Sequence, residues 1–370
     1  MNEIKSVRYS YLSQQFADCD DLWSELKNFV KSGDFTLGKE LHKFENSFAQ
    51  LIGSKYAIGV NSGTDAIKLS LKSIGVKPGD EVITAANTFV ATVGAINEVG
   101  AIPVFVDCNE TFCMDVNQIE QKINSKTKAI VPVHFSGYMT NMPKLLELAS
   151  KYQIPVVEDA CQAILASIDN KNAGTWGVTG AFSLHPLKNI NVWSDGGVIV
   201  TNDEKIYETL KLLRNHGLIN RDEVEILGYN SRLDTFQAVV GNWLLPKAKD
   251  ISNKRIENAH YLDSLLSTIP EIKIPERRKN ERVVFHLYMF RAQYRDELLN
   301  YLLSKNIEAK VHYPVPMYRQ KALENLGHKV GDFPQADLDS KNLISLPCDQ
   351  HLNRDQLDSM FNCVKKFYND

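Results

Sequence analysis

The chain has 370 residues, 44% of them hydrophobic and 24% charged, and its formal net charge is −3. That length is sufficient for one large domain with its own core and a smaller second domain. A nucleic-acid-binding protein would show a basic excess on at least one domain, so the composition predicts no nucleic-acid partner.

Several features predict a cytoplasmic protein. The N-terminal segment MNEIKSVRYS lacks the apolar core and the cleavage pattern of a signal peptide. No uninterrupted apolar segment approaches the roughly 18 residues of a membrane span. The six cysteines are mostly far apart, and the pair Cys108 and Cys113 has no second pair or nearby histidine to complete a metal set. We therefore expect reduced thiols, no bound metal and no membrane partner.

Apolar, β-branched runs alternate with helix-like segments through the first half of the chain. The predicted strands are Tyr56–Val60, Glu81–Thr84, Ile102–Val106, Ala129–Val133 and Pro155–Val157, and the predicted helices are Thr64–Ser73, Thr88–Val99 and Met142–Tyr152. This alternation favours an α/β fold in which helices cover both faces of a parallel sheet.

The pattern changes after Gly228. Apolar residues at three- and four-residue spacing predict an amphipathic helix from Leu233 to about Arg255, which Pro246 should kink or break. The rest of the chain mixes predicted strands (Val284–Ala292, Glu308–His312) with predicted helices (Tyr294–Ser304, Arg354–Phe367). We expect a large domain over 1–249, which includes the N-terminal segment, and a small α+β domain over 250–370.

The segment Asn61–Asp65 (NSGTD) lies between a predicted strand and a predicted helix. Ser62 or Thr64 can cap the helix, and Gly63 allows a ligand to approach the backbone. A helix N-terminus presents free N–H groups and a positive dipole end to an anion, so this segment is a candidate phosphate site. The alternative is a plain N-cap after a tight turn.

Two carboxylates, Glu158 and Asp159, directly follow another predicted strand. At least one of them should lie at the carboxyl edge of the sheet, where ligands bind in open α/β folds. A carboxylate at that edge can pair with a cationic ring nitrogen. The alternative is that Asp159 caps a helix.

Lys188 lies in a turn-like stretch between two predicted core strands. Many of its neighbours are apolar, namely Phe182, Leu184, Leu187, Ile190, Val192 and Trp193. A lysine held partly out of water loses proton affinity and becomes a nucleophile toward carbonyl groups. The alternative is an ordinary surface lysine. Together with the anion site and the carboxylate, a lysine that forms a Schiff base is what pyridoxal phosphate requires.

The chain resembles the DegT/DnrJ/EryC1/StrS aminotransferases, which are fold-type I pyridoxal-phosphate enzymes that act on keto sugars. The resemblance runs from GDFTLG (Gly33–Gly38) to the C-terminal helix. It is carried by GVNSGTDAIKLSLKSIGVKPGDEVI, NTFVAT, PVHFSGYM, PVVEDACQA, FSLHPLKN, SDGGVIVTND, LRNHG and GYNSRLDTFQA. It implies a large domain with a mixed, mostly parallel sheet and a smaller C-terminal α+β domain.

The resemblance implies a role for each matching residue. Lys188 would bind the cofactor covalently and move the proton during transamination, and Asp159 would pair with the pyridine nitrogen. Gln162 would lie near the phenolic oxygen of the cofactor, and Phe89 would stack on its ring.

The resemblance also implies how the phosphate is held. Ser62, Gly63, Thr64 and Ser183 would bind it from within one subunit. Asn230 would reach the phosphate of the neighbouring subunit, which requires a homodimer with two shared active sites.

Each of these side chains also has a structural alternative. Phe89 could be a core residue. Ser183 could cap a turn, Asn230 could serve the turn that begins at Gly228, and Arg232 could form a structural ion pair.

Candidate substrate contacts are His185, Tyr313, Tyr318 and Arg232. Some relatives carry a histidine in place of the lysine and dehydrate sugars, but His185 lies too early to be that histidine, and Lys188 favours transamination. In the stretch HYPVPMY, relatives often have a histidine where this chain has Tyr318. That departure puts substrate contacts from this stretch in doubt.

The expected activity is transfer of an amino group from glutamate or glutamine to a nucleotide-linked keto sugar, for amino-sugar biosynthesis such as that of lipopolysaccharide O-antigen. The stretches SDGG and GYNSRLD favour a 3-keto-6-deoxyhexose over a 4-keto sugar. Alternatives are a cyclitol ketone as substrate, a sugar dehydratase, and a non-catalytic regulator that senses pyridoxal phosphate.

Overall fold

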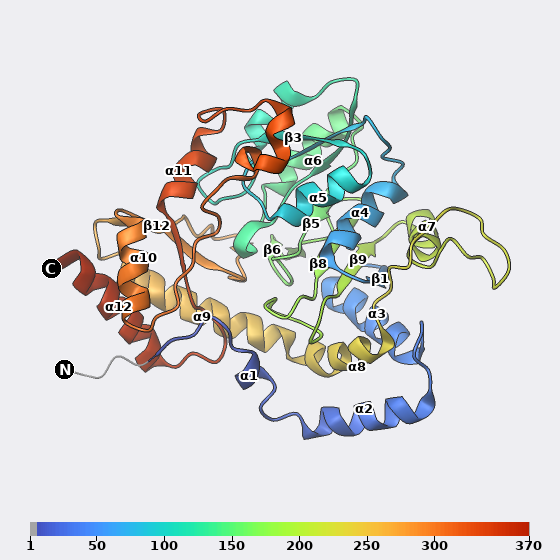
Figure 1. Ribbon diagram of the computed structural model, residues 1–370, viewed down its shortest axis with the longest axis horizontal. Coiled ribbons are helices and arrows are strands. Elements are labelled where there is room, and N and C mark those ends of the chain that lie inside the picture. The colour runs from blue at the N-terminus through green and yellow to red at the C-terminus, as the bar shows by residue number, and fades with distance from the viewer. Residues whose placement is uncertain (1–5, 370) are drawn as a thin grey trace.

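A computed structural model describes residues 6–369 (Figure 1). Its α-helices are α1 (Leu12–Gln15), α2 (Asp20–Ser32), α3 (Lys39–Ile52), α4 (Gly63–Ser73), α5 (Val90–Glu98), α6 (Met142–Lys151), α7 (Glu204–Arg214), α8 (Thr235–Leu244), α9 (Ala248–Leu266), α10 (Arg295–Ser304), α11 (Pro334–Asn342) and α12 (Arg354–Asn369). None of these helices combines the length and hydropathy that a bilayer-spanning segment requires.

A central sheet organises the first part of the chain. One half has the strand order β1 (Tyr56–Val60), β9 (Gly197–Thr201), β8 (Thr179–Ser183), β5 (Val157–Asp159), and the other half has the order β3 (Ile102–Val106), β2 (Glu81–Ala85), β4 (Thr127–Val131). Parallel bridges from Ile130 to Val156 and from Val133 to Asp159 join the two halves through β4 and β5. Five predicted strands are therefore present, with bounds shifted by up to two residues.

The sheet is mixed, as the family resemblance implies, and β9 is the strand that departs from a purely parallel arrangement. It runs antiparallel to both of its neighbours, β1 and β8. The connection from β8 to β9 (184–196) contains no helix. A parallel neighbour needs a long crossover that is usually helical, so this connection brings the chain back in the opposite direction.

Helices cover both faces of the sheet, as the alternation of elements predicts. Residues of α4, α5 and α7 form one hydrophobic core with the sheet, and residues of α3, α6 and α8 form another on the opposite face. The predicted helix from Leu233 is broken at Pro246, which lies in a 3₁₀ turn between α8 and α9. It then continues to Leu266, well beyond the predicted end.

The last third of the chain has its own core around the antiparallel strands β10 (Ile272–Lys273), β12 (Tyr288–Ala292) and β13 (Leu343–Leu346). The predicted strand Glu308–His312 does not form, and only Lys310 makes an isolated bridge there, to Ser345. Three short strands, β6 (Ser167–Ile168), β7 (Lys171–Asn172) and β11 (Glu281–Arg282), pair this part with the first.

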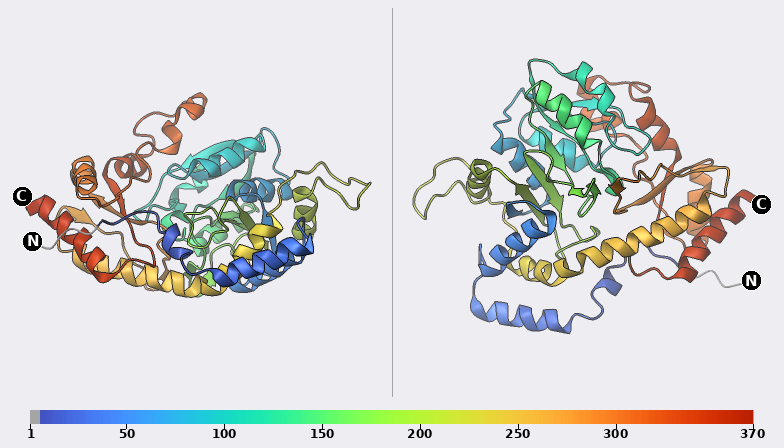
Figure 2. Two further views of the ribbon diagram at one scale, coloured as in Figure 1. Left: turned by 60° about the horizontal axis from the view of Figure 1, so that its bottom comes forward. Right: turned by 180° about the vertical axis from the view of Figure 1, so that it is seen from behind.

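Helix α9 connects the two parts of the chain. Ala248 and Ile251 pack into the core of the large sheet, whereas Ala259 and Leu262 pack into the C-terminal core. Figures 1 and 2 show α9 extending from α8 toward α10 and α12. The N-terminal segment also reaches the C-terminal core, where Val7 pairs with Ile307, although the sequence places this segment with the large domain.

Candidate functional site

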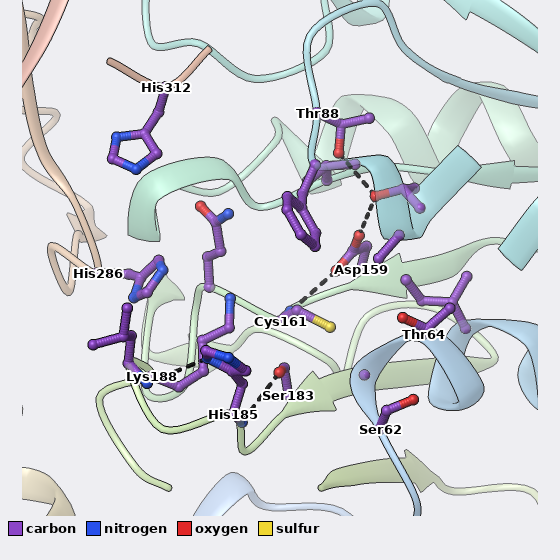
Figure 3. Close-up of a pocket in the computed structure, with 18 of the residues that line it drawn as sticks. Ser62, Thr64, Thr88, Asp159, Cys161, Ser183, His185, Lys188, His286 and His312 are labelled. Atoms are coloured by element: carbon purple, nitrogen blue, oxygen red, sulfur yellow. Dashed lines mark hydrogen bonds between the residues drawn. The ribbon is translucent and has the colours of Figure 1, made fainter. Parts of the chain in front are cut away.

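A cavity of about 250 Å³ opens where β5 and β8 end and α4 begins (Figure 3). Parallel strands present their carboxyl ends at one edge of a sheet, which is the edge where α/β folds bind ligands. The cavity is lined by ten of the residues that the sequence singles out, namely Ser62, Gly63, Thr64, Phe89, Asp159, Gln162, Ser183, His185, Lys188 and Tyr313. Side chains as far apart in the sequence as Ser62 and Tyr313 therefore meet around one cavity.

Strand β5 separates the two consecutive carboxylates. Successive side chains of a strand point to opposite faces, so only Asp159 lines the cavity, where its side chain is buried. One carboxylate oxygen accepts a hydrogen bond from the Thr92 hydroxyl at 2.7 Å, and the other accepts one from the Cys161 N–H at 3.1 Å. These bonds fix the orientation of the carboxylate toward the cavity.

Glu158 points away from the cavity and stabilises the segment that precedes β8. Its carboxylate accepts hydrogen bonds from the N–H groups of Gly174, Trp176 and Gly177 at 2.7–2.8 Å, and it pairs with His134 Nε2 at 2.8 Å. A buried carboxylate left without partners would cost several kcal/mol, so four partners make this position tolerable. Glu158 therefore has a structural role, whereas Asp159 faces the cavity.

Lys188 enters the cavity from the loop between β8 and β9, and Figure 3 shows it with Asp159 and Thr64 around the same space. Two of the hydrogen bonds that hold the loop involve Lys188 itself. Its N–H donates to the His185 carbonyl at 2.8 Å, and its carbonyl accepts from the Tyr11 hydroxyl at 3.0 Å. Burial lowers the pKa of the Lys188 amine, and nearby Cys161 and Asp159 partly oppose this shift. The amine is therefore more readily neutral, and nucleophilic, than an exposed lysine.

The N-terminus of α4 is the candidate anion cradle. Ser62 is its N-cap, and the Ser62 hydroxyl accepts a hydrogen bond from the Asp65 N–H at 3.1 Å. The N–H groups of Gly63 and Thr64 are left without partners in the helix. A Cβ on Gly63 would lie 2.8 Å from the Ser183 Cβ and 2.9 Å from the Cys161 Sγ, so only glycine fits there. This donor set and its close approach fit a phosphate group.

Aromatic and amide side chains line the remaining wall. Phe89 is 50% exposed and lines the cavity, so much of its ring faces the cavity rather than a core. The centroid of the Phe89 ring lies 6.0 Å from that of the Tyr313 ring. The Gln162 carbonyl oxygen accepts a hydrogen bond from the Ser136 N–H at 2.6 Å, so its NH₂ group remains to donate. An aromatic face and an amide donor suit the ring and the phenolic oxygen of pyridoxal phosphate.

Three histidines line the cavity, and the sequence identified only His185. The His185 Nδ1 accepts a hydrogen bond from the Leu187 N–H at 3.3 Å. Burial lowers the pKa of all three imidazoles, for His312 to about 4, so they are neutral near pH 7. His286 and His312 come from the C-terminal part of the chain. His312 begins the stretch HYPVPMY but has no assigned role there, and none of the motifs contains His286.

Three predicted site residues lie outside this cavity. The structure corrects the prediction that Tyr318 contacts the substrate. Its buried hydroxyl donates to the Asp337 carboxylate at 2.6 Å, and its ring packs against Phe333. The side chain is therefore not available to a substrate. Arg232, a candidate substrate contact, donates to the Asn215 side chain at 3.0 Å. Asn230 is exposed and pairs with the backbone of Asn215.

Comparisons with known sequences show the family of the chain. The sequence model of the DegT/DnrJ/EryC1/StrS aminotransferase family matches residues 18–365. A protein of Geobacillus stearothermophilus named "Pleiotropic regulatory protein" is 37% identical over 96% of this chain and 97% of its own length. The "dTDP-3-amino-3,4,6-trideoxy-alpha-D-glucose transaminase" of Streptomyces venezuelae is 36% identical over 91% of this chain and 89% of its own length.

Solved structures have the same fold. The crystal structure of S. venezuelae DesV superposes with a TM-score of 0.96 at 34% identity and covers 99% of both chains. The structure of NtdA from Bacillus subtilis, which contains the bound cofactor PMP, has a TM-score of 0.92 at 27% identity and covers 100% of this chain and 86% of its own.

The close approach at Gly63 predicts a selective loss of phosphate binding in Gly63→Ala. The added methyl group should weaken the affinity of the apoprotein for pyridoxal phosphate about tenfold or more, because overpacking of this size costs 1–3 kcal/mol. Affinity for pyridoxal, which lacks the phosphate, should change little. Titration of both aldehydes by absorbance measures this difference.

Gly94→Ala is the matched control, because a Cβ at this helical glycine meets nothing within 4 Å. Equal losses for the two aldehydes in Gly63→Ala would show that the cradle does not hold the phosphate.

The lowered pKa of Lys188 predicts how cofactor capture depends on pH. The rate at which the apoprotein captures pyridoxal phosphate should rise with pH as the amine loses its proton. The midpoint of this rise should lie below pH 10.5, which is the ordinary pKa of a lysine. Asp159 is one of the groups that raise this pKa, so Asp159→Asn should move the midpoint to lower pH. Stopped-flow absorbance measures the midpoint, and a midpoint at or above 10.5 would contradict the burial of this amine.

Proposed function

Because the chain belongs to the DegT/DnrJ/EryC1/StrS aminotransferase family, whose members use pyridoxal phosphate, we propose that it transfers an amino group from glutamate to carbon 3 of a nucleotide-linked keto sugar. One observation carries the proposal. A lysine with a lowered pKa, a buried carboxylate and a helix-end anion cradle line the same cavity. The product would be an amino sugar for surface polysaccharides such as O-antigen.

Each proposed role follows from the position of the side chain. When bound, pyridoxal phosphate supplies a reactive aldehyde and a cationic ring that withdraws electrons from the reacting carbon. The Asp159 carboxylate would hold the proton on the ring nitrogen. The neutral Lys188 amine accepts the proton that leaves the α-carbon of the amino donor. It later returns a proton to the sugar carbon that receives the amino group.

Two observations support a sugar nucleotide with a 3-keto group. The S. venezuelae relative is named for a dTDP-linked sugar with an amino group at carbon 3. This chain also carries SDGG at 194–197, which is more typical of members that aminate carbon 3. His185, His312 and Tyr313 line the cavity and offer hydrogen-bonding groups to sugar hydroxyls.

All six cysteines are unpaired, which supports a cytoplasmic location.

The proposed assembly is a homodimer with shared sites. Asn230 is exposed and outside the cavity of its own chain, as a residue that serves a partner would be. Figure 1 shows the loop after α7 extending away from the rest of the chain. Ile219, Val224 and Leu227 in this loop are 58%, 55% and 93% exposed, which is unusual for apolar residues unless a second surface covers them.

A regulatory role is the second candidate function, because the Geobacillus relative is named a regulatory protein. A protein that only senses the cofactor needs a site that binds it but does not need a proton-transferring lysine. The position of Lys188 beside Asp159 in the cavity favours catalysis.

The first half-reaction tests the proposal. Addition of glutamate to the cofactor-loaded protein should shift the yellow absorbance band to the shorter wavelength of the amino form of the cofactor. Lys188→Ala should abolish this shift, because no other group is proposed to move the proton, and Lys205→Ala on α7 should retain it. Absorbance spectra before and after glutamate provide the measurement.

Acceptors are then compared by return of the yellow band. A 3-keto sugar nucleotide should restore it faster than a 4-keto isomer. A protein that binds the cofactor but does not respond to any amino donor would favour the regulatory role, and a protein that binds no cofactor would exclude both functions.

The shared site predicts an effect of Asn230→Ala. This variant should bind pyridoxal phosphate less tightly, by roughly tenfold, the loss expected for one hydrogen bond to a charged group. Light scattering should give twice the 41.8 kDa of one chain for both the wild type and the variant. A monomer that binds the cofactor at full affinity would rule out the shared site.

A further inference from the structure

A short chain of hydroxyl groups ends on the Asp159 carboxylate. The Thr92 hydroxyl donates to Asp159 Oδ2 at 2.7 Å, and the hydroxyls of Thr88 and Thr92 lie 2.8 Å apart (Figure 3). The exposed fractions of Thr88 and Thr92 are 2% and 1%, so water does not compete for these bonds. Both threonines belong to the stretch NTFVAT, in which the resemblance assigns a role only to Phe89.

The bond from Thr92 to Asp159 fixes the direction of these hydrogen bonds. An ionised carboxylate can only accept, so the single hydroxyl proton of Thr92 is committed to Asp159. Thr92 can then only accept from Thr88, and Thr88 must be the donor of that pair. The order of donation is therefore Thr88 to Thr92 to Asp159.

Both threonines lie in the segment that also supplies Phe89. Thr92 is in the first turn of α5, where its N–H donates to the Phe89 carbonyl at 3.2 Å. One turn of chain therefore places an aromatic ring and a hydroxyl pair along the cavity wall, with the hydroxyl of Thr92 on Asp159. Movement of this turn would change the cavity wall and the carboxylate together.

We propose that Thr88 and Thr92 are positioning residues that orient the Asp159 carboxylate and moderate its negative charge toward the cofactor ring. The Thr92 bond, with the Cys161 N–H on the other oxygen, prevents the carboxylate from rotating. Donation from Thr88 polarises the Thr92 hydroxyl and strengthens its bond to Asp159. The hydrogen bonds from the threonines neutralise part of the negative charge of the Asp159 carboxylate, and less of that charge then acts on the ring nitrogen. Thr88 and Thr92 therefore set how strongly Asp159 stabilises a cationic ring.

This inference rests on the proposed pairing of Asp159 with the ring nitrogen, and one series of variants tests both. Thr92→Val removes the hydroxyl at nearly constant shape, Thr92→Ser retains it, and Thr88→Val removes only the outer donor. For each reconstituted protein, absorbance titrations give the pyridoxal phosphate dissociation constant and the pH midpoint of the bound chromophore.

Thr92→Val should weaken cofactor affinity, because the Asp159 carboxylate is no longer held in one orientation toward the ring nitrogen. Its chromophore midpoint should move to higher pH, because a carboxylate with fewer donors favours the protonated form of its neighbour more strongly. Thr92→Ser should behave like the wild type, and Thr88→Val should show smaller changes in the same directions.

Thr84→Val is the matched control. Thr84 is also a fully buried threonine, but its hydroxyl donates to the Val131 carbonyl at 2.9 Å and has no contact with Asp159. This variant should leave the midpoint unchanged even if it unfolds at a lower temperature. A purely structural role of Thr92 would lower thermal stability without moving the midpoint.

Asp159→Asn separates the two hypotheses. If Asp159→Asn changes affinity and midpoint but Thr92→Val changes neither, the proposed hydroxyl pair is wrong and the role of Asp159 stands. If Asp159→Asn itself changes neither, the pairing with the ring nitrogen fails, and the inference about the threonines fails with it.

Discussion

The alternation of side chains along β5 is the constraint on which the site depends. Glu158 and Asp159 are consecutive, so the strand must send them to opposite sides. Glu158 is then surrounded by the backbone donors of Gly174, Trp176 and Gly177, whereas Asp159 lines the cavity. A shift of β5 by one residue would exchange the two carboxylates, and the donors around Glu158 oppose such a shift.

The position of Lys188 depends on the reversed strand β9. Because β9 runs antiparallel to β8, the connection between them turns back over the carboxyl edge of the sheet, where Asp159 and Ser183 lie. The Tyr11 hydroxyl holds this connection at the Lys188 carbonyl from a distant part of the chain. The same fold therefore brings an amine, a carboxylate and an anion cradle together and lowers the pKa of the amine by burial.

The C-terminal part of the chain completes the cavity. His286, His312 and Tyr313 line it although their own core lies elsewhere. Helix α9 packs into both cores, and β11 pairs with β6, so the two parts are joined at more than one place. The side chains that the sequence assigns to cofactor chemistry come from the large sheet. His286, His312 and Tyr313, from the C-terminal part, close the cavity opposite them.

The sequence by itself determined the five strands β1 to β5 to within two residues, the break at Pro246 and the three segments around Ser62, Asp159 and Lys188 that line the cavity, because periodicity, turn chemistry and local motifs are properties of short segments. Only the tertiary structure decided which carboxylate faces the cavity and that β9 runs antiparallel. It also revealed His286, His312 and the bond from Thr92 to Asp159, 67 residues apart. It removed Tyr318 from the cavity by pairing it with Asp337. Such contacts depend on how distant segments pack, and no local pattern encodes that.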